Sequence, residues 1–363
     1  MIHRRRFLSF LGAAPLLAQA PAVPRELEWH DARKFTIEGL GFKDRKSPFD
    51  RLPAPAEAVV RKAVWDLSRD SAGVLVRFTA STTAIHARWT LTGKTLASAN
   101  ITAVAASGLD LYAKTDAGRW HWLGIGRPTQ VPDNTDVLAG GIPAAQREYM
   151  LYLPLRNGIA SLEIGVHKGS AISPAPARAA ASKPIVFYGT SITHGISASR
   201  AGMTHVAVLG RMFNREVINL GFSGNGRMEP EVTKFVAAID AGVFVLDCLP
   251  NMNAKDIHER AAACVKTLRA AHPKTPILLV EDRNYPSGFL IAARAETNRN
   301  NHQAMRAVYA QLQHDKVPYL YYLKGDNLLA PDGEDTVDGS HPTDLGFQHQ
   351  AAAFAKVLRH ILK

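Results

Sequence analysis

The second half of the chain contains four short runs of apolar residues separated by amphipathic stretches. The runs span residues 184–188, 217–220, 243–246 and 277–280. A strand covered on both faces reads as a continuous apolar run, and the stretches between the runs, for example 256–271 and 294–313, have helical periodicity. Strands that alternate with helices predict a parallel sheet flanked by helices. In such sheets, ligands bind at the carboxyl ends of the strands.

Four polar segments follow or lie beyond these runs. They are Gly189-Thr190-Ser191-Ile192, Gly221-Phe222-Ser223-Gly224-Asn225, Pro250-Asn251-Met252 and Asp338-Gly339-Ser340-His341. The first three follow the first three predicted strands, and the fourth lies near the C-terminal end. This placement predicts one shared site, with the residue types of a serine esterase.

Ser191 is the candidate nucleophile. Serine attacks weakly at neutral pH, so it needs a base within hydrogen-bonding reach and a turn that presents its hydroxyl. Gly189 and Gly195 allow a tight strand-to-helix turn, and the amides of the helix expected to follow would lie near a developing oxyanion. Taken alone, Gly-x-Ser more often marks a helix cap. The assignment of Ser191 therefore depends on the other segments.

His341 is the candidate base, because an Asp three residues earlier can reach its imidazole and select its tautomer. Asp338 is that candidate acid. The structural alternative is the start of a helix capped by Thr343 or Asp344, and both interpretations can hold together. His194 is the rival base and a candidate substrate contact, ranked second because its side chain need not face the substrate from a helix.

An oxyanion needs preorganised donors, and three are candidates: the backbone amide of Ser191, the amide of Gly224 and the side-chain amide of Asn251. Gly224 suits a close approach to substrate because it has no side chain. Asn225 is a competing donor or a weaker substrate contact, and for both asparagines the alternative is a turn residue. Asp247, at the end of the third predicted strand, is expected to be a structural partner of nearby backbone amides.

The first half of the chain has a different pattern, with short alternating strands between turns over residues 65–166. Candidate strands are 74–78, 85–89 and 109–112. Asp116-Ala117-Gly118 is predicted to be a hairpin turn, and so is Asn157-Gly158, between strands at 149–155 and 159–166. Strands at this spacing predict a sandwich of the jelly-roll type.

The 363 residues are too many for one ordinary core and favour two domains. We predict a β-sandwich domain over residues 25–166, a linker over 167–183 that is rich in Gly, Pro and Ala, and an α/β domain over 184–363.

Residues 1–20 are typical of a signal peptide. Arg4-Arg5-Arg6-Phe7-Leu8 precedes an apolar run that ends at Leu17, and Ala18-Gln19-Ala20 is a small-x-small cleavage site. The paired arginines favour the twin-arginine route over a generic signal or an uncleaved anchor. The run is shorter than the roughly 20 residues that span a bilayer. We therefore predict a periplasmic or secreted protein without stable membrane insertion.

Charge and cysteine content exclude several functions. The formal net charge is +11, and the signal contributes three arginines and no acid, so the rest carries 11 − 3 = +8. These charges are scattered singly, so no nucleic-acid partner is predicted. Cys248 and Cys264 are too few for a disulfide framework and are expected to be buried thiols. No His, Asp or Glu group has ligand spacing, so neither a metal nor another cofactor is expected.

The four polar segments resemble the conserved blocks of the SGNH, or GDSL, hydrolase superfamily, in the same chain order, over roughly residues 183–360. The resemblance implies a flavodoxin-like three-layer α/β fold with Ser191 as nucleophile and first oxyanion donor. It further implies Gly224 and Asn251 as donors, His341 as base and Asp338 as its acid. Thr190 replaces the Asp of the superfamily's name, but that Asp is not the catalytic acid.

The β-rich half resembles the N-terminal domain of a bacterial branch of this superfamily. The likeness is carried by Phe49-Asp50-Arg51-Leu52-Pro53, Gly108-Leu109-Asp110-Leu111-Tyr112 and Gly118-Arg119-Trp120-His121-Trp122. Many multidomain members of the superfamily act on acylated carbohydrates, so the resemblance implies de-O-acetylation of a glycan or glycoside. Trp120 and Trp122 share a strand face, where they would stack on sugars, or would more often be core residues.

Two other functions stay open. One is a lipase or thioesterase that uses the same residues, although no lid segment rich in Leu and Phe is evident. The other is a carbohydrate-binding protein with an inactive hydrolase domain, against which the intact set of five site residues argues. The expected partner is an acylated carbohydrate or a small ester, and the oligomeric state is open.

Overall fold

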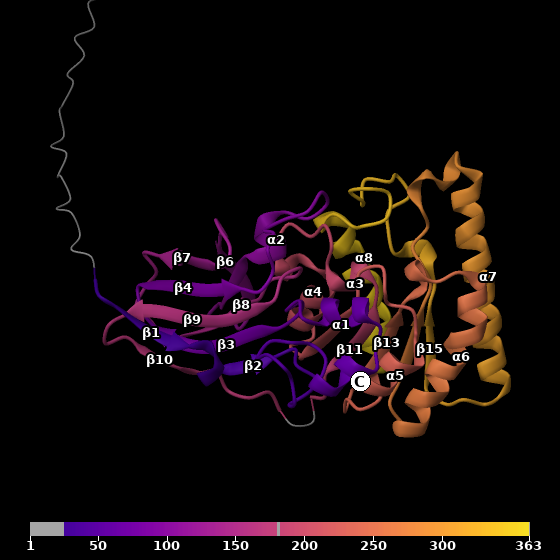
Figure 1. Cartoon of the computed structure of the whole chain (residues 1–363), viewed down its shortest axis with the longest axis horizontal. Helices are drawn as coiled ribbons and strands as arrows, with labels where there is room; N and C mark the ends of the chain where they lie inside the picture. Colours follow the sequence, from indigo (N-terminus) through magenta and orange to yellow (C-terminus); the bar gives the residue numbers. More distant parts are fainter. Residues whose placement is uncertain (1–24, 180–181, 363) are drawn as a thin grey trace, which may run out of the picture.

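The computed structural model describes residues 25–179 and 182–362, so the predicted signal peptide lies outside the described residues. Two parts lie side by side (Figure 1): a sandwich region, residues 25–174, and an α/β region, residues 182–362. Among the described residues, no helix is both long enough and apolar enough to cross a membrane.

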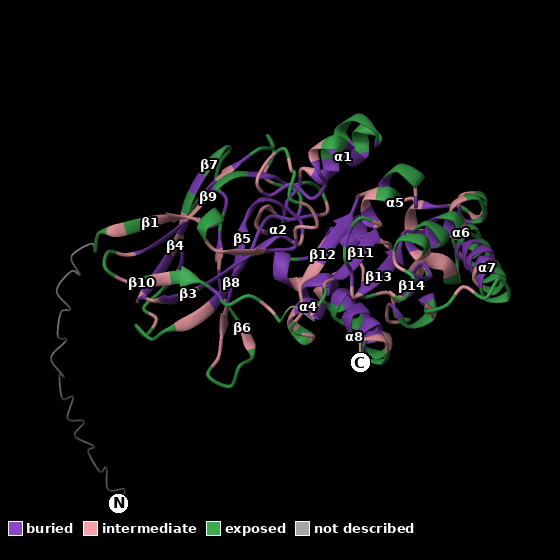
Figure 2. Ribbon diagram, turned by 90° about the horizontal axis from the view of Figure 1, so that it is seen from below, coloured by how far each residue is buried: buried purple, intermediate pink, exposed green. Residues whose placement is uncertain are grey.

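One parallel sheet of five strands forms the centre of the α/β region, in the order β12-β11-β13-β14-β15. The strands are β11 (Ile185–Gly189), β12 (Val217–Gly221), β13 (Val243–Asp247), β14 (Ile277–Val280) and β15 (Leu320–Leu323). The first four are the predicted apolar runs, and Figure 2 shows β11, β12 and β13 as buried ribbons. The order is the flavodoxin-like 2-1-3-4-5, which confirms the predicted fold class.

Helices cover both faces of this sheet. They are α3 (Ser191–His194), α4 (His205–Met212), α5 (Pro230–Val236), α6 (Ala254–Ala271), α7 (Ala292–His314) and α8 (Asp344–Ile361). Alternate residues of each strand enter two separate cores: α5, α6 and α7 pack on one face, and α4 and α8 pack on the other. This is the three-layer arrangement that the sequence predicts. The predicted helices 256–271 and 294–313 correspond to α6 and α7.

Two antiparallel sheets make up the sandwich region. The first contains β1 (Leu27–Asp31), β9 (Ile159–His167), β4 (Ala84–Leu91) and β7 (Asp133–Gly140). The second contains β10 (Ala171–Pro174), β3 (Leu75–Ser81), β8 (Arg147–Tyr152), β5 (Leu109–Lys114) and β6 (Trp120–Gly126), with β2 (Thr36–Glu38) paired to β3. Apolar residues from both sheets form one core, as expected for a sandwich.

Of the two hairpin turns predicted for this region, one is present and the other is not. Asp116-Ala117-Gly118 does join the antiparallel pair β5 and β6, with Gly118 at φ 75°. Asn157-Gly158 is not a hairpin, because β8 and β9 belong to different sheets. A Cβ on Gly158 would lie 2.4 Å from the Arg69 carbonyl oxygen, so close packing excludes a side chain there. Strand β10 lies within the predicted linker and pairs with β3.

The stretch from residue 39 to 72 contains no strand and packs against the α/β region. Its helix α1 (Lys62–Ser68) and the residues before it share a core with β12 and α5, with Leu52, Val64 and Trp65 buried. Another short helix, α2 (Ala103–Ser107), follows a loop between β4 and β5. The sandwich region therefore sends two non-strand segments toward its neighbour.

Arg51 joins the two regions. Arg51 is 1% exposed, and its guanidinium donates to the carbonyl oxygens of Leu67 (2.6 Å), Asp70 (2.8 Å), Asn219 (2.9 Å) and Gly221 (2.8 Å). Asn219 and Gly221 belong to β12, and Gly221 begins one of the polar segments. Arg51 thus fixes the carboxyl end of a strand in the other region.

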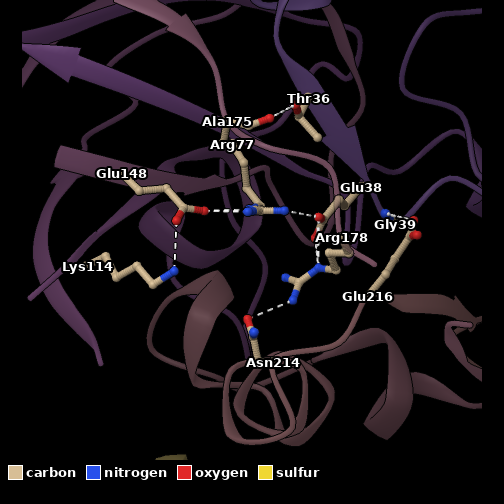
Figure 3. A network of polar contacts seen from close by, with 10 residues as sticks. All are labelled: Thr36, Glu38, Gly39, Arg77, Lys114, Glu148, Ala175, Arg178, Asn214 and Glu216. Atoms are coloured by element: carbon tan, nitrogen blue, oxygen red, sulfur yellow. Dashed lines mark hydrogen bonds and ion pairs between the residues drawn. The ribbon is translucent and has the colours of Figure 1, made fainter. Parts of the chain in front are cut away.

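A network of charges makes a second joint (Figure 3). Arg77 on β3 donates to Glu38 (2.5 Å) and to Glu148. Arg178, in the connecting segment, donates to Glu38 (2.8 Å) and to Asn214 of the α/β region (2.9 Å). These charges are mostly buried and are paired, as burial requires.

Candidate active site

Ser191 is the first residue of α3 and follows β11 directly. The Thr190 hydroxyl caps the helix by accepting from the Ile192 amide (3.3 Å), and Gly195 ends it at φ 105°. The helix expected after the serine is therefore a single turn of four residues. The turn lies at the point where strand order reverses around β11, the place where ligands bind in such sheets.

His341 reaches Ser191 from the other end of the chain. Its Nε2 lies 2.8 Å from the Ser191 Oγ, and its Nδ1 lies 2.7 Å from Asp338 Oδ2. The loop that carries the pair is closed by an antiparallel bridge between Thr336 and Pro342. The structure thus brings together the three residues that the sequence analysis assigned as nucleophile, base and acid.

Asp338 accepts four hydrogen bonds. Oδ1 accepts from the amides of Ser340 (3.1 Å) and His341 (2.8 Å), and Oδ2 accepts from the His341 ring (2.7 Å) and from Asn100 Nδ2 (3.1 Å). Partial burial raises the pKa of Asp338, but the bonds from His341 and Asn100 outweigh it and lower the pKa to about 2. The ionised carboxylate holds the Nδ1 proton of His341, so the Nε2 lone pair faces Ser191.

Two of the predicted oxyanion donors lie on the neighbouring loops. Asn251 ends a short turn after β13, and its Oδ1 accepts from the Gly226 amide (3.2 Å), which directs its NH₂ group the other way. A Cβ on Gly226 would lie 1.9 Å from the Gly189 carbonyl oxygen, so the loop after β12 packs tightly on the turn that carries Ser191. Gly224 has φ 71°, and no protein atom lies within 4 Å of its Cβ position. The positive φ at position 224 favours glycine, although the surrounding protein leaves room for a side chain.

His194 does not face the site. Its ring is fully buried, and Nε2 donates to the Leu155 carbonyl oxygen of the sandwich region (2.6 Å). Burial and the nearby Arg51 and Arg156 hold the pKa of His194 well below its usual value. The expectation that His194 contacts substrate is wrong, because the single-turn helix directs the ring into the joint between the regions.

Asn225 is occupied by its own turn. Its NH₂ group donates to the Ser223 carbonyl oxygen (2.8 Å), and its Oδ1 accepts from Arg61 (2.8 Å). The geometry favours the alternative of a turn residue over a substrate contact. Arg61, which also pairs with Glu229 at 2.5 Å, is a sandwich-region residue that no sequence pattern singled out.

A buried ion pair contacts the helical turn that carries Ser191. Asp247, at the end of β13, accepts from Thr193 on α3 (3.0 Å) and from two nitrogens of Arg283, one of them at 2.9 Å. The expectation of a structural role for Asp247 agrees with this geometry, but its partners are a guanidinium and a hydroxyl instead of backbone amides. Gln350 on α8 also accepts from Arg283 (2.6 Å).

The remaining candidate residues are two tryptophans and two cysteines. Trp122 is 50% exposed, so the core alternative is wrong for this residue, while Trp120 is partly buried. Both cysteines are free and buried, and burial raises the pKa of Cys264 to about 12. Within residues 25–179 and 182–362, no group of three or more His, Cys, Asp or Glu side chains is arranged to hold a metal ion.

The fold and this site define a three-layer α/β protein with the residue set of an acyl hydrolase. The chain belongs to the GDSL-like lipase/acylhydrolase family, whose model matches residues 182–359. A second model, described as the N-terminus of SGNH-hydrolase-type esterases and named GxDLY, matches residues 27–172. Its name repeats the Gly108–Tyr112 motif.

Solved structures agree with this assignment. A Bacteroides ovatus protein described as a GDSL-like lipase is 36% identical, with a TM-score of 0.88 over 93% of this chain and 98% of its own. The salicylyl-acyltransferase of a tetracycline biosynthetic pathway is 17% identical (TM-score 0.75; 92% and 97% covered). A family two carbohydrate esterase from Cellvibrio japonicus is 11% identical (TM-score 0.59; 93% and 98% covered). The last two share the fold. A search of curated protein sequences gives no significant match.

Proposed function

We propose that the protein is an exported serine esterase that removes short acyl groups, acetyl first, from carbohydrates. The observation that carries the proposal is the continuous hydrogen-bonded chain from Ser191 Oγ through the His341 ring to Asp338. A serine hydroxyl in this arrangement is poised for proton transfer to the imidazole as it attacks.

The proposed reaction has two halves. Ser191 Oγ attacks the ester carbonyl while its proton moves to His341 Nε2, and the amides of Ser191, Gly224 and Asn251 stabilise the oxyanion. Collapse of the tetrahedral intermediate breaks the bond to the alcohol oxygen, which takes the proton from His341. In the second half, water gives a proton to His341 Nε2 as it attacks the carbonyl carbon of the acyl-enzyme. The bond between that carbon and Ser191 Oγ then breaks, Oγ takes the proton back from His341, and the carboxylic acid leaves.

Two considerations support a carbohydrate ester as substrate. One structural neighbour is a carbohydrate esterase, and the predicted signal at residues 1–20 would deliver the protein to where polymeric glycans lie. The export proposal predicts that the mature protein begins at Pro21, which mass spectrometry of a periplasmic fraction tests.

One feature favours a second candidate, hydrolysis of longer acyl esters. After β14, three consecutive apolar side chains are exposed: Phe289 (83%), Leu290 (78%) and Ile291 (51%). Their segment begins at Pro286, whose Cβ lies 3.2 Å from the Cβ position of Gly333, in the stretch that leads to His341. No periodic pattern or motif of the sequence singles out this cluster. Three exposed apolar side chains on a segment that contacts the stretch leading to His341 suit a lipid or a long acyl chain.

The test compares Ser191→Ala with the unmodified protein on p-nitrophenyl acetate, butyrate and octanoate and on acetylated xylan and mannan. We expect the variant to lose at least about 10⁴-fold in kcat/KM, with thermal unfolding unchanged. Preference for acetate and release of acetate from a polysaccharide support the carbohydrate assignment. Preference for octanoate supports the second candidate, and retained activity in Ser191→Ala contradicts both.

A further inference from the structure

A loop of the sandwich region touches the candidate active site. The loop before α2 and the loop before α8 meet at the top of Figure 1. At that point Asn100 Nδ2 lies 3.1 Å from Asp338 Oδ2 and 3.5 Å from His341 Nδ1. Among the described residues, Asn100 is the only sandwich-region residue whose side chain is hydrogen-bonded to Ser191, His341 or Asp338.

The backbone around Asn100 is held firmly. Its carbonyl oxygen accepts from the Ser197 hydroxyl (2.7 Å), and Thr102 donates to the Ser199 carbonyl oxygen (3.2 Å). Ser98 and Ile101 close the loop tip with two backbone hydrogen bonds. Ser197 and Ser199 lie just after the nucleophile turn, so the loop is fixed to one catalytic segment while its Asn100 side chain contacts the other.

The surrounding charges fix the orientation of the Asn100 amide. A carboxylate is an acceptor only, so the NH₂ group must face Asp338. His341 Nδ1 carries a proton that it donates to the same Oδ2, so Nδ1 cannot accept from Asn100. Asp338 is therefore the acceptor for the Asn100 NH₂ group. Oδ1 of Asp338 is bound by the two backbone amides of its own loop. The bond from Asn100 therefore resists rotation of the carboxylate away from the His341 ring.

We propose that Asn100 is a positioning residue for the catalytic acid, so that the sandwich region completes the active site of the α/β region. The proposal rests on the proposed esterase function. Asn100 does not touch the reacting atoms; it acts through Asp338 and the orientation of the His341 ring. Because Asp338 is partly exposed to water, which can replace one donor, we expect a moderate effect.

The first test measures kcat and KM for Asn100→Ala, Asn100→Asp and Ser98→Ala on p-nitrophenyl acetate. We expect Asn100→Ala to lower kcat about 10-fold with KM within about twofold, since one bond to a charged group is lost. Asn100→Asp should lower kcat further, because a second carboxylate repels the first. Ser98→Ala, a change at an exposed position in the same loop, should behave as the unmodified protein. Unchanged kcat in both Asn100 variants overturns the proposal.

A double-mutant cycle separates positioning from a general structural role. Asp338→Ala retains residual turnover because the nucleophile, the base and the oxyanion donors remain. If Asn100 acts through Asp338, adding Asn100→Ala to Asp338→Ala should change kcat by less than about twofold. A further 10-fold loss in that background would show that Asn100 acts elsewhere and would overturn the proposal.

A spectroscopic measurement does not depend on turnover. The His341 Nδ1 proton held by Asp338 should give a low-field proton NMR signal that is absent in His341→Ala. We expect this signal to shift or broaden in Asn100→Ala and to stay in place in Ser98→Ala; an unmoved signal in Asn100→Ala counts against positioning. The esterase function itself is tested separately by Ser191→Ala, so failure of one proposal is distinguishable from failure of the other.

Discussion

The two regions of the molecule supply different parts of the candidate site. The α/β region places Ser191 directly after the buried strand β11 and Asn251 at the end of a short turn after β13, and it carries His341 on the loop before α8. The sandwich region contributes Arg51 and Asn100, single side chains from irregular segments whose partners lie 168 and 238 residues away. The ends of the parallel strands thus position candidate site residues, while single side-chain contacts between the two regions hold the site segments in place.

Two histidines of the α/β region allow the strongest test of this division. His341→Ala should lower kcat/KM at least about 10³-fold and leave thermal unfolding nearly unchanged, because the proposed general base, which lies on a loop, is lost. His194→Ala should keep kcat within about threefold and lower stability by about 2–4 kcal/mol, because it opens a cavity and leaves the Leu155 carbonyl unpaired. Ester hydrolysis and denaturant unfolding of both variants measure the two effects.

The opposite outcome would break the comparison between the regions. If His194→Ala loses more activity than His341→Ala while both remain folded, His194 participates in the chemistry, and the joint between the regions is part of the reaction centre. A His194→Gln variant is the matched control, because its side-chain NH₂ group takes the place of the His194 Nε2 that donates to the Leu155 carbonyl.

A second prediction concerns the buried arginines of the two regions. Arg283 is neutralised by Asp247, whereas Arg51 is surrounded mainly by carbonyl oxygens, and burial lowers the pKa of Arg51 to about 10. Arg51→Met should cost about 3–5 kcal/mol, because four carbonyl oxygens lose a charged donor. Denaturant unfolding measures this loss, and we expect both regions to unfold at a lower midpoint.

Arg33→Met is the control for Arg51→Met, because Arg33 is an exposed arginine of the sandwich region that pairs with Asp31. It should leave the midpoint unchanged. If Arg51→Met also leaves the unfolding midpoint unchanged, water replaces the guanidinium, and Arg51 does not hold the two regions together.

Much of the α/β region can be predicted from the sequence because its signals are local. The apolar runs of β11 to β14 need no knowledge of distant contacts, since a strand covered on both faces must be apolar throughout. Asp338 and His341 are three residues apart, so their contact is also local. The placement of Ser191 and Asn251 at one edge of the sheet follows from strand-end geometry, because all carboxyl ends of a parallel sheet share one edge. His341 follows no predicted strand, so its meeting with Ser191 is predicted from residue type and from the resemblance.

The features that sequence reasoning missed depend on distant partners. Gly158 looks like a turn residue, but it is a glycine because the Arg69 backbone passes close by. His194 looks like a second base until the buried Leu155 carbonyl is placed beside it. Arg51 was noticed only within a motif of the resemblance, and Asn100 not at all, since neither lies in a periodic pattern.

The smallest predicted effect uses one buried carboxyl group from each region. Burial raises the pKa of Asp282, in the α/β region, to about 7, and that of Asp70, in the sandwich region, to about 6. A raised folded-state pKa gives stability that is present below the unfolded value, near 3.8, and is lost as the pH rises through the folded value. Asp282→Asn should therefore flatten the fall in Tm between about pH 4 and pH 7.

Asp70→Asn should flatten the curve over a narrower window, ending near pH 6, because Arg156 lies 2.7 Å from the Asp70 carboxylate and compensates its charge. Asp282 has the backbone amide of Arg283 at 2.7 Å as its hydrogen-bond donor. Its ionisation is therefore less well compensated and continues to higher pH. Tm measured from pH 4 to pH 8 for the unmodified protein and both variants tests this difference. If both variants flatten the Tm curve over the same pH range, the ion pair with Arg156 does not make the ionisation of Asp70 differ from that of Asp282.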